Sequence, residues 1–467
     1  MLGDPLQTAL GRIVGAEHVL RAPRVSSPYN HDASRRRGVV GRADAVVLPG
    51  SAAEVAAVVR WCYAHEVAIV SRGGGTGLAG GAVALEGGVV CSMERMNRVR
   101  ELEPELWRMY PEAGVRTSDV RRLARENGLM FAPDPGASEQ SQIGGNVATN
   151  AGGPHALKYG ASGSWVRGLE AVIAPGELIT LGGVARRDVA GYDLKSLLIG
   201  SEGTLGVITA VRLGLLPAPE AAIALVVFLR TRAEGCGAIL EVLGAGLQPA
   251  VLEFVDGETL AIVARAYPGA AAGEGVPAGA GFALIVEVDG SRAQAQAQRA
   301  ELLELLGSAA VAIDEPQDAA ALWRWRDGFN GAVTAARGGK LSEDVVFPVE
   351  RLAEALERFE VLAAEQGLRS CAWGHGGDGN VHATVLVDPE REAELDAAEA
   401  TGEKLFALAI ALGGSITGEH GVGWVKRGWL ARQLGDARAV ELHEQIKRVF
   451  DPKGLLNPGK KLARDPV

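Results

Sequence analysis

Short apolar runs alternate with amphipathic stretches over the first half of the chain, a pattern typical of mixed strands and helices. Ser51 precedes one amphipathic stretch and Glu54 follows three positions later, so a capping box is predicted to begin a helix that ends near His65. Continuous apolar runs predict buried strands at 43–48, 67–71 and 89–92. Glycine-punctuated stretches are expected to add further strands at 143–153 and 200–216.

A stiff segment, Pro217-Ala218-Pro219, separates this region from a second one. Beyond it, helical patterns at about 293–306 and 318–336 alternate with apolar runs at 223–229, 250–255 and 283–288. This order predicts an α+β domain with an antiparallel sheet. A last helix is expected at about 436–450. The predicted domains are therefore 1–217, 218–420 and a C-terminal segment, 421–467, that returns to the first domain.

The amino-acid composition is typical of a globular protein. The chain has 467 residues, of which 47% are hydrophobic and 22% charged, so we expect a globular protein of two or three domains. The formal net charge of -10 argues against nucleic acid as the main partner. We see neither a membrane-spanning run nor a secretory signal, so a cytoplasmic location is expected. Isolated cysteines are predicted to be buried thiols: Cys62, Cys91, Cys236 and Cys371.

A glycine loop, Arg72-Gly73-Gly74-Gly75-Thr76-Gly77, follows a predicted strand and suits a phosphate group. The run from Gly75 to Gly80 matches G-x-G-x-x-G, but residues 81–88 leave no room for the helix of a Rossmann unit before the next strand. We therefore expect its backbone N–H groups to form an anion-binding nest, with an ordinary glycine-rich turn as the alternative. Similar runs at 143–153 and 200–209 suggest a backbone lining around an extended ligand.

Three of the eight histidines lie between His375 and His420. His375 and His382 bracket a glycine-rich hairpin, and Glu419 precedes His420. Two imidazoles and one carboxylate can hold a divalent metal such as zinc, manganese or iron. We predict that His375, His382 and Glu419 are metal ligands and that His420 is a base. Two alternatives stay open. His420 could be the third ligand with Glu419 as its outer partner, or the histidines could be ordinary hydrogen-bonded residues of a tight turn.

Other polar residues are expected to complete this region. Asp378 and Asn380 are predicted to hold the rings of the metal ligands. Arg326 and Lys340 flank a segment that ends at Pro348, and they could anchor a carboxylate. The alternative for Arg326 is a position on a solvated helix face.

These motifs, in this order, resemble the flavin-dependent oxidases and dehydrogenases of the vanillyl-alcohol-oxidase/p-cresol-methylhydroxylase (PCMH) type. The motifs are 72–76, 143–146, 191–194, 200–206, 375–382, 419–420 and 457–460. The resemblance covers about residues 40 to 460, and the most similar branch contains D-lactate dehydrogenases, the glycolate oxidase flavin subunit and D-2-hydroxyglutarate dehydrogenase. One departure is the bulky stretch from Trp107 to Pro111, which puts the expected local strand in doubt.

The resemblance implies an α+β fold, with a PCMH-type FAD-binding domain, an α+β substrate (cap) domain carrying an antiparallel sheet, and a C-terminal helical segment. It implies non-covalent FAD, because the first loop has Thr76 where some relatives have a histidine. The residues expected to bind FAD are Arg72, Gly73, Gly74, Gly75, Thr76, Gly77, Pro133, Asp134, Gly144, Gly145, Thr149, Asn150, Gly152, Glu202, Gly203, Ile208 and Asn457.

The implied activity is the metal-assisted oxidation of a small D-2-hydroxy acid (D-lactate, glycolate or D-2-hydroxyglutarate) to the 2-oxo acid, with hydride transfer to flavin N5. His420, Arg326 and Lys340 would be the catalytic residues. An electron acceptor is expected as a partner: quinone, cytochrome, electron-transfer flavoprotein or an iron–sulfur subunit, with peripheral membrane association and a homodimer as options. The alternatives are a non-redox flavoenzyme similar to alkylglycerone-phosphate synthase, a non-catalytic flavin subunit of an oxidase complex, and a Rossmann NAD enzyme.

Overall fold

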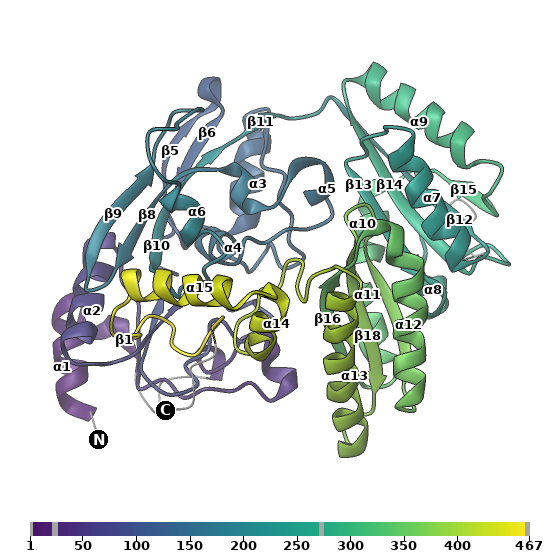
Figure 1. Cartoon of the computed structure of the whole chain (residues 1–467). Helices are drawn as coiled ribbons and strands as arrows, with labels where there is room; N and C mark the ends of the chain where they lie inside the picture. Colours follow the sequence, from purple (N-terminus) through teal and green to yellow (C-terminus); the bar gives the residue numbers. More distant parts are fainter. Residues whose placement is uncertain (1–2, 21–26, 270–274, 463–467) are drawn as a thin grey trace. The chain divides into compact units, whose positions relative to one another are not determined.

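A computed structural model describes residues 3–20, 27–269 and 275–462 (Figure 1). Contacts between Cα atoms divide the chain into two compact units. The first unit comprises Met1–Gly152, Ala161–Ala218 and Glu419–Val467, and the second comprises Gly153–Gly160 and Pro219–Gly418. The domain boundaries expected from the sequence, after residues 217 and 420, stay predictions.

A mixed sheet in the first unit has the strand order β1 (Val19–Leu20), β2 (Ala45–Val47), β4 (Val89–Ser92) and β3 (Ile69–Arg72). β1 is antiparallel to β2, whereas β4 is parallel to both β2 and β3. The three strands predicted for this region are confirmed. The helix between β2 and β3 is α2 (Ala52–Ala64), and Ser51 caps it by accepting the backbone N–H of Glu54 at 3.2 Å. The Glu54 carboxylate accepts the N–H of Gly50.

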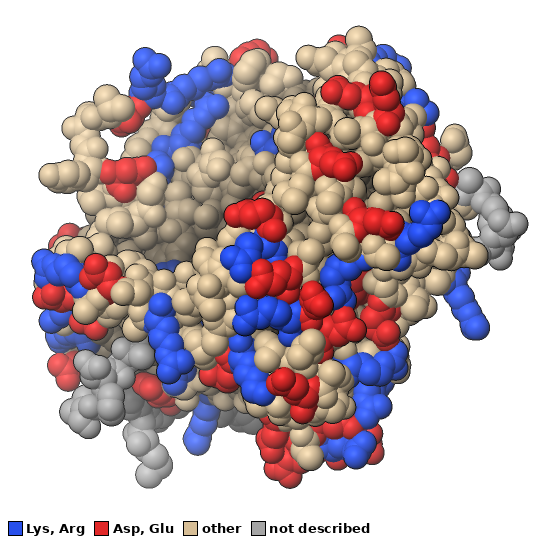
Figure 2. Space-filling model, turned by 45° about the vertical axis from the view of Figure 1, so that its right-hand side comes forward, with Lys and Arg blue, Asp and Glu red and all other residues tan. Residues whose placement is uncertain are grey.

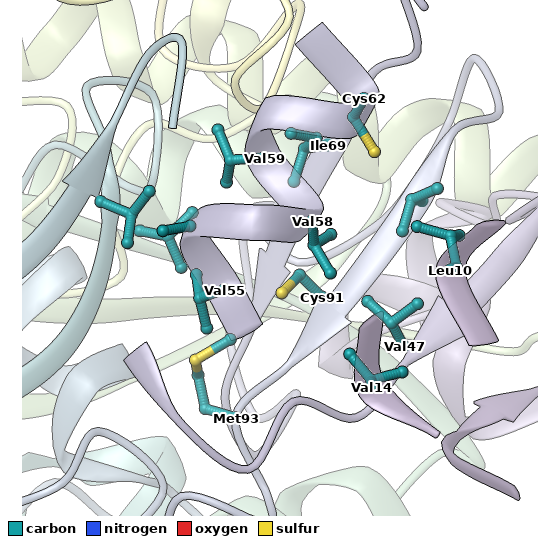
Figure 3. Packing of buried hydrophobic residues seen from close by; sticks show 14 of the residues in the cluster. Leu10, Val14, Val47, Val55, Val58, Val59, Cys62, Ile69, Cys91 and Met93 are labelled. Carbon is teal, nitrogen blue, oxygen red and sulfur yellow. The ribbon is translucent and has the colours of Figure 1, made fainter. Parts of the chain in front are cut away.

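Side chains of α1 (Gly3–Val14), α2 and this sheet form one apolar core (Figure 3). Leu10, Val47, Val58 and Cys91 are completely buried within it. Burial raises the pKa of the Cys91 thiol to about 12, because the thiolate would lose its hydration. The prediction of buried thiols is confirmed, since these cysteines are all buried and unbridged: Cys62, Cys91, Cys236 and Cys371.

The second sheet of this unit is antiparallel, in the order β5 (Val99–Glu103), β6 (Arg108–Pro111), β10 (Val207–Gly214), β8 (Val166–Ile173) and β9 (Glu177–Gly182). Short strands β7 (Leu129–Met130) and β11 (Leu216–Pro217) pair separately. The bulky stretch after Trp107 does form a strand. Trp107 adopts a left-handed conformation with φ 54°, which ends a short 3-10 helix before β6 begins.

The helices of the first unit include α3 (Thr117–Glu126), α4 (Ile143–Thr149) and α6 (Leu194–Leu198). The prediction of strands at 143–153 is wrong, because residues 143–149 are helical. The glycines here permit close packing: a Cβ on Gly144 would lie 2.5 Å from the Cβ of Ala113. The strands expected within 200–216 are confirmed by β10 and the start of β11.

Gly144→Ala is expected to destabilise the protein by about 1–3 kcal/mol, because the added methyl group has no space against Ala113. Gly145→Ala is the matched control, since its Cβ would have its nearest neighbour, the Cα of Gly73, at 4.0 Å. Urea unfolding of the two variants measures the difference. Equal stability of the two variants would contradict the packing argument.

The second unit contains a seven-stranded antiparallel sheet, as predicted. Its strands follow the order β15 (Ala312–Asp314), β12 (Ala221–Leu229), β14 (Phe282–Gly290), β13 (Val251–Asp256), β17 (Arg369–His375), β18 (Asn380–Val387) and β16 (Gly339–Val346).

Helices cover both faces of this sheet, which explains why β18 is buried along its whole length. One face packs against α8 (Gly257–Val263), α10 (Ala319–Asp327) and α11 (Phe329–Ala335). The helix predicted at 318–336 is thus divided at Gly328. The remaining helices are α5 (Ala156–Tyr159), α7 (Arg232–Gly244), α9 (Arg292–Leu306), α12 (Leu352–Glu365) and α13 (Glu392–Ala411).

The last stretch of the first unit contains α14 (Leu430–Leu434) and α15 (Ala437–Phe450), which confirms the helix expected at 436–450. The chain then returns to β3, where the N–H of Asn457 donates to the carbonyl of Ile69 at 2.7 Å. Among the described residues, we find no helix with both the length and the apolar character that a membrane crossing needs. Acidic and basic side chains are interspersed on the face shown in Figure 2.

Candidate functional site

The glycine loop after β3 is shaped by contacts that only glycine permits. A Cβ on Gly74 would overlap the carbonyl of Gln140, and a Cβ on Gly75 would overlap the guanidinium of Arg72. Gly75 also has φ 69°, a left-handed conformation that glycine adopts without strain. No helix interrupts residues 73–88, all of which are described, so the Rossmann alternative has no structural support.

Arg72, at the start of this loop, connects it to the segment from Pro28 to His31. Its guanidinium donates to the backbone carbonyls of Pro28 at 2.6 Å and His31 at 2.9 Å. Burial lowers the pKa of Arg72, and the neighbouring carboxylate of Asp32 opposes that shift. Arg72 therefore anchors the loop to the backbone of the preceding segment. It also lines the pocket described next.

A pocket opens over this loop in the first unit. It brings together most of the residues predicted to bind the cofactor: Arg72, Gly73, Gly74, Gly75, Thr76, Gly77, Gly144, Gly145, Thr149, Glu202, Gly203 and Ile208. His420 lines the same pocket. Predicted residues outside its lining are Pro133, Asp134, Asn150, Gly152 and Asn457. Sequence reasoning missed the lining residues Ser71, Ala79, Gly81, Ala82, Met93, Ser141, Gln142, Asn146, Ala148 and Gly206.

The pocket offers the groups that a dinucleotide cofactor needs. Glycines let the backbone approach a phosphate closely. The buried side-chain oxygen of Gln142 has no hydrogen-bond partner among the described residues, so it can accept a hydrogen bond from a ligand. The residues present therefore fit FAD. Gln142 adjoins the Ile143 glycine run, a signal that could have found it.

Glu202 and Asn457 support the wall of the pocket. The Glu202 carboxylate accepts the backbone N–H groups of Val422 at 2.9 Å and Gly423 at 2.6 Å. The Asn457 amide donates to the carbonyls of Gly81 at 2.8 Å and Glu202 at 2.7 Å. These bonds fix the segment that follows His420, so the two residues position the wall on which His420 lies.

The two histidines predicted to bind metal lie close together. His375 and His382 both belong to the second unit, whereas Glu419 begins the last stretch of the first unit. His375 ends β17, and His382 lies on β18 after the glycine hairpin. Both histidines are buried, and Glu419 is partly exposed. Two imidazoles and one carboxylate are a donor set that suits zinc or a similar divalent metal, and the role of these three residues as ligands stays a prediction.

The hairpin between the histidines depends on Gly379. Its φ is 76°, and a Cβ at this position would overlap the carbonyl of Phe347. The two imidazole rings lie with centroids 5.4 Å apart and planes at 84°. A tight turn without side chains at its contact points thus brings the two histidines together.

Asp344 on β16 positions the residues before Glu419. Its Oδ2 atom accepts the Thr417 hydroxyl at 2.7 Å and the backbone N–H of Gly418 at 2.8 Å. Its Oδ1 atom accepts the amide of Asn380 at 2.6 Å. Asn380, predicted to hold a ligand ring, thus donates to Asp344. The ring role expected for Asp378 and Asn380 stays a prediction.

Arg326 and Lys340 have contacts that the sequence did not indicate. The Arg326 Nε atom donates to the buried carboxylate of Glu253 at 2.7 Å. The Lys340 ammonium lies 4.8 Å from the centroid of the Trp373 ring. Their predicted role in binding a substrate carboxylate stays a prediction. His420 lies beside Glu419, with 3.7 Å between its Nε2 atom and the Glu419 Oε1 atom.

Comparison with known families places this chain in a class. The FAD binding domain family matches residues 43–182, and the family of FAD linked oxidases, C-terminal domain, matches residues 218–461. The chain belongs to the FAD-linked oxidases. The prediction of an FAD-dependent oxidoreductase is confirmed.

Individual relatives define the branch. The chain is 35% identical over 457 residues to the glycolate oxidase subunit GlcD of Bacillus subtilis (strain 168), covering 95% of this chain and 96% of the relative. It is 33% identical over 458 residues to the D-lactate dehydrogenase of Anaerostipes hadrus, covering 96% of this chain and 95% of the relative. The solved structure of p-cresol methylhydroxylase with substrate bound has a TM-score of 0.81 at 17% identity, covering 99% of this chain and 98% of the p-cresol methylhydroxylase chain. The predicted branch and the PCMH-type fold are confirmed.

Proposed function

We propose that this protein oxidises a small D-2-hydroxy acid to the 2-oxo acid, with non-covalent FAD as the hydride acceptor and a divalent metal at the His375, His382 and Glu419 cluster. The approach of the His375 and His382 rings, with centroids 5.4 Å apart, is the observation that carries the metal part of the proposal. Sequence relatives named glycolate oxidase subunit and D-lactate dehydrogenase support the substrate class. The candidates are D-lactate, glycolate and D-2-hydroxyglutarate.

The proposed reaction assigns a separate role to the cofactor, the metal and the side chains. Bound FAD supplies a two-electron acceptor, and a divalent metal supplies a Lewis acid that lowers the pKa of a hydroxyl group. His420 accepts the proton of the substrate hydroxyl. Lys340 and Arg326 are the cations proposed to orient the substrate carboxylate. Flavin re-oxidation needs a separate acceptor, for which we propose a quinone, cytochrome, electron-transfer flavoprotein or iron–sulfur subunit.

The composition of the first loop supports non-covalent FAD in the first unit. Residues 73–88 contain no histidine, and Thr76 of this loop lines the pocket. Denaturation followed by filtration is therefore expected to release the flavin from the polypeptide.

Anaerobic mixing tests the proposed reaction. The purified holoenzyme, supplied with Zn²⁺ or Mn²⁺, should lose its oxidised flavin absorption at about 450 nm when D-lactate, glycolate or D-2-hydroxyglutarate is added. L-Lactate is the stereochemical control and should leave the band unchanged. An unchanged band with every D-2-hydroxy acid, with and without metal, would overturn the proposal. It would favour a non-redox flavoenzyme of the same fold or a non-catalytic flavin subunit.

A further inference from the structure

Glu253 is a buried carboxylate that contacts the first predicted metal ligand. It lies on β13 and is 1% exposed. In the antiparallel register of β13 and β17, Glu253 is directly opposite His375, so both side chains lie on the same face of the sheet. The Oε1 atom of Glu253 is hydrogen-bonded to the Nδ1 atom of His375. Because an ionised carboxylate only accepts hydrogen bonds, Nδ1 carries the proton in this pair.

Arg326 neutralises the charge of Glu253. Its Nε and Nη2 atoms lie 2.7 Å and 2.5 Å from the Oε2 atom of the carboxylate. The two carboxylate oxygens are thus divided between one arginine and one histidine. A buried carboxylate with no such partner would be costly, because it loses its hydration without compensation.

We propose that Glu253 is a positioning residue of the metal site and that Arg326 acts through it. With Nδ1 bound to the carboxylate, the ring of His375 presents Nε2 to the metal in a fixed orientation. Partners of this kind fix the orientation of metal-bound histidines. This inference rests on the proposed metal-assisted function. It gives Arg326 a role that does not require contact with the substrate.

A second pair in the same unit provides the matched control. Glu287 on β14 is also buried and accepts from a histidine, His155, at 3.1 Å and from the indole N–H of Trp323 at 3.2 Å. Neither Glu287 nor His155 belongs to the predicted metal cluster. Glu287→Gln therefore perturbs a buried carboxylate of the same sheet that is bonded to a histidine, without altering a ligand of the site.

The test measures metal affinity directly. The FAD-loaded enzyme is freed of metal with a chelator and then titrated with Zn²⁺ in a calorimeter. Glu253→Gln keeps an acceptor but removes its charge, so the affinity for Zn²⁺ is expected to fall about tenfold. The double variant Glu253→Leu/Arg326→Met removes both buried charges together and should lose up to about 100-fold. Glu287→Gln should retain wild-type affinity, and all variants should retain flavin.

Turnover provides an independent readout. In Glu253→Gln, turnover with the reactive D-2-hydroxy acid should recover as the metal concentration is raised, whereas general damage to the fold would not be reversed by metal. Equal Zn²⁺ affinity in wild type, Glu253→Gln and the double variant would overturn the role of Glu253 and leave the proposed function intact. Absence of binding to the wild-type enzyme would instead overturn the metal-assisted function itself.

Discussion

Replacing His382 by alanine is expected to abolish metal binding and to lower turnover about 10³-fold or more, while the protein keeps its flavin. The expected loss follows from the several kcal/mol that a Lewis acid contributes to the transition state, since each 1.36 kcal/mol is a factor of ten. His382 lies on β18 in the second unit, whereas the residues that line the FAD pocket all belong to the first unit. Flavin should therefore remain bound.

Two measurements check this result: metal content by mass spectrometry, and flavin content from the visible spectrum. The control is Thr384→Ser, a conservative change two residues along the same strand, where the hydroxyl pairs with Ser342 at 2.6 Å. It should keep metal and turnover. Loss of flavin together with metal in the His382 variant would contradict the separation of the two sites.

His420→Gln is the second variant with a large expected effect. General base catalysis contributes about 10²- to 10⁴-fold, so kcat should fall by that amount. Because His420 lines the pocket but is not one of the three proposed metal ligands, both flavin and metal should remain bound. Stopped-flow measurement of flavin reduction gives the rate, and metal analysis on the same sample gives occupancy.

The same variant separates the two roles considered for the Glu419–His420 pair. A proton-accepting His420 predicts slow reduction with full metal occupancy. Loss of the metal in His420→Gln would contradict this role and would instead favour His420 as the third ligand, with Glu419 as its outer partner. Glu419→Gln completes the comparison, because it should lose the metal under our assignment.

Sequence reasoning found the predicted cluster because the information is local. The two histidines lie seven positions apart around glycines, and this spacing alone predicts a hairpin that brings them together. The pairing of Glu253 with His375 had no such signal. It depends on the register between β13 and β17, which are separated by more than one hundred residues. It also depends on α10, the helix that carries Arg326. Partners of that kind follow from topology, which a single sequence does not encode locally.

The error at 143–149 has a different origin. Glycine is a poor helix former, so local propensity gives no indication of a helix in the glycine-rich stretch at 143–153. In the folded protein, Gly144 packs against Ala113 and makes a short helix possible at that place. Tertiary packing thus outweighs local propensity there. The same limitation left Asp344 unidentified, since its hydrogen bonds to Thr417 and Gly418 join segments that are distant in sequence.

The interleaved order of the two units constrains how the polypeptide can acquire its structure during synthesis. Residues 153–160 belong to the second unit but are synthesised long before the strands of its sheet. In the folded unit, the Tyr159 hydroxyl donates to Asp289 on β14 at 2.7 Å. The first unit is incomplete until its last stretch, from Glu419 onward, has been translated. Separate expression of residues 219–418 would therefore leave Asp289 without its tyrosine donor, and no single continuous stretch of the gene encodes either complete unit.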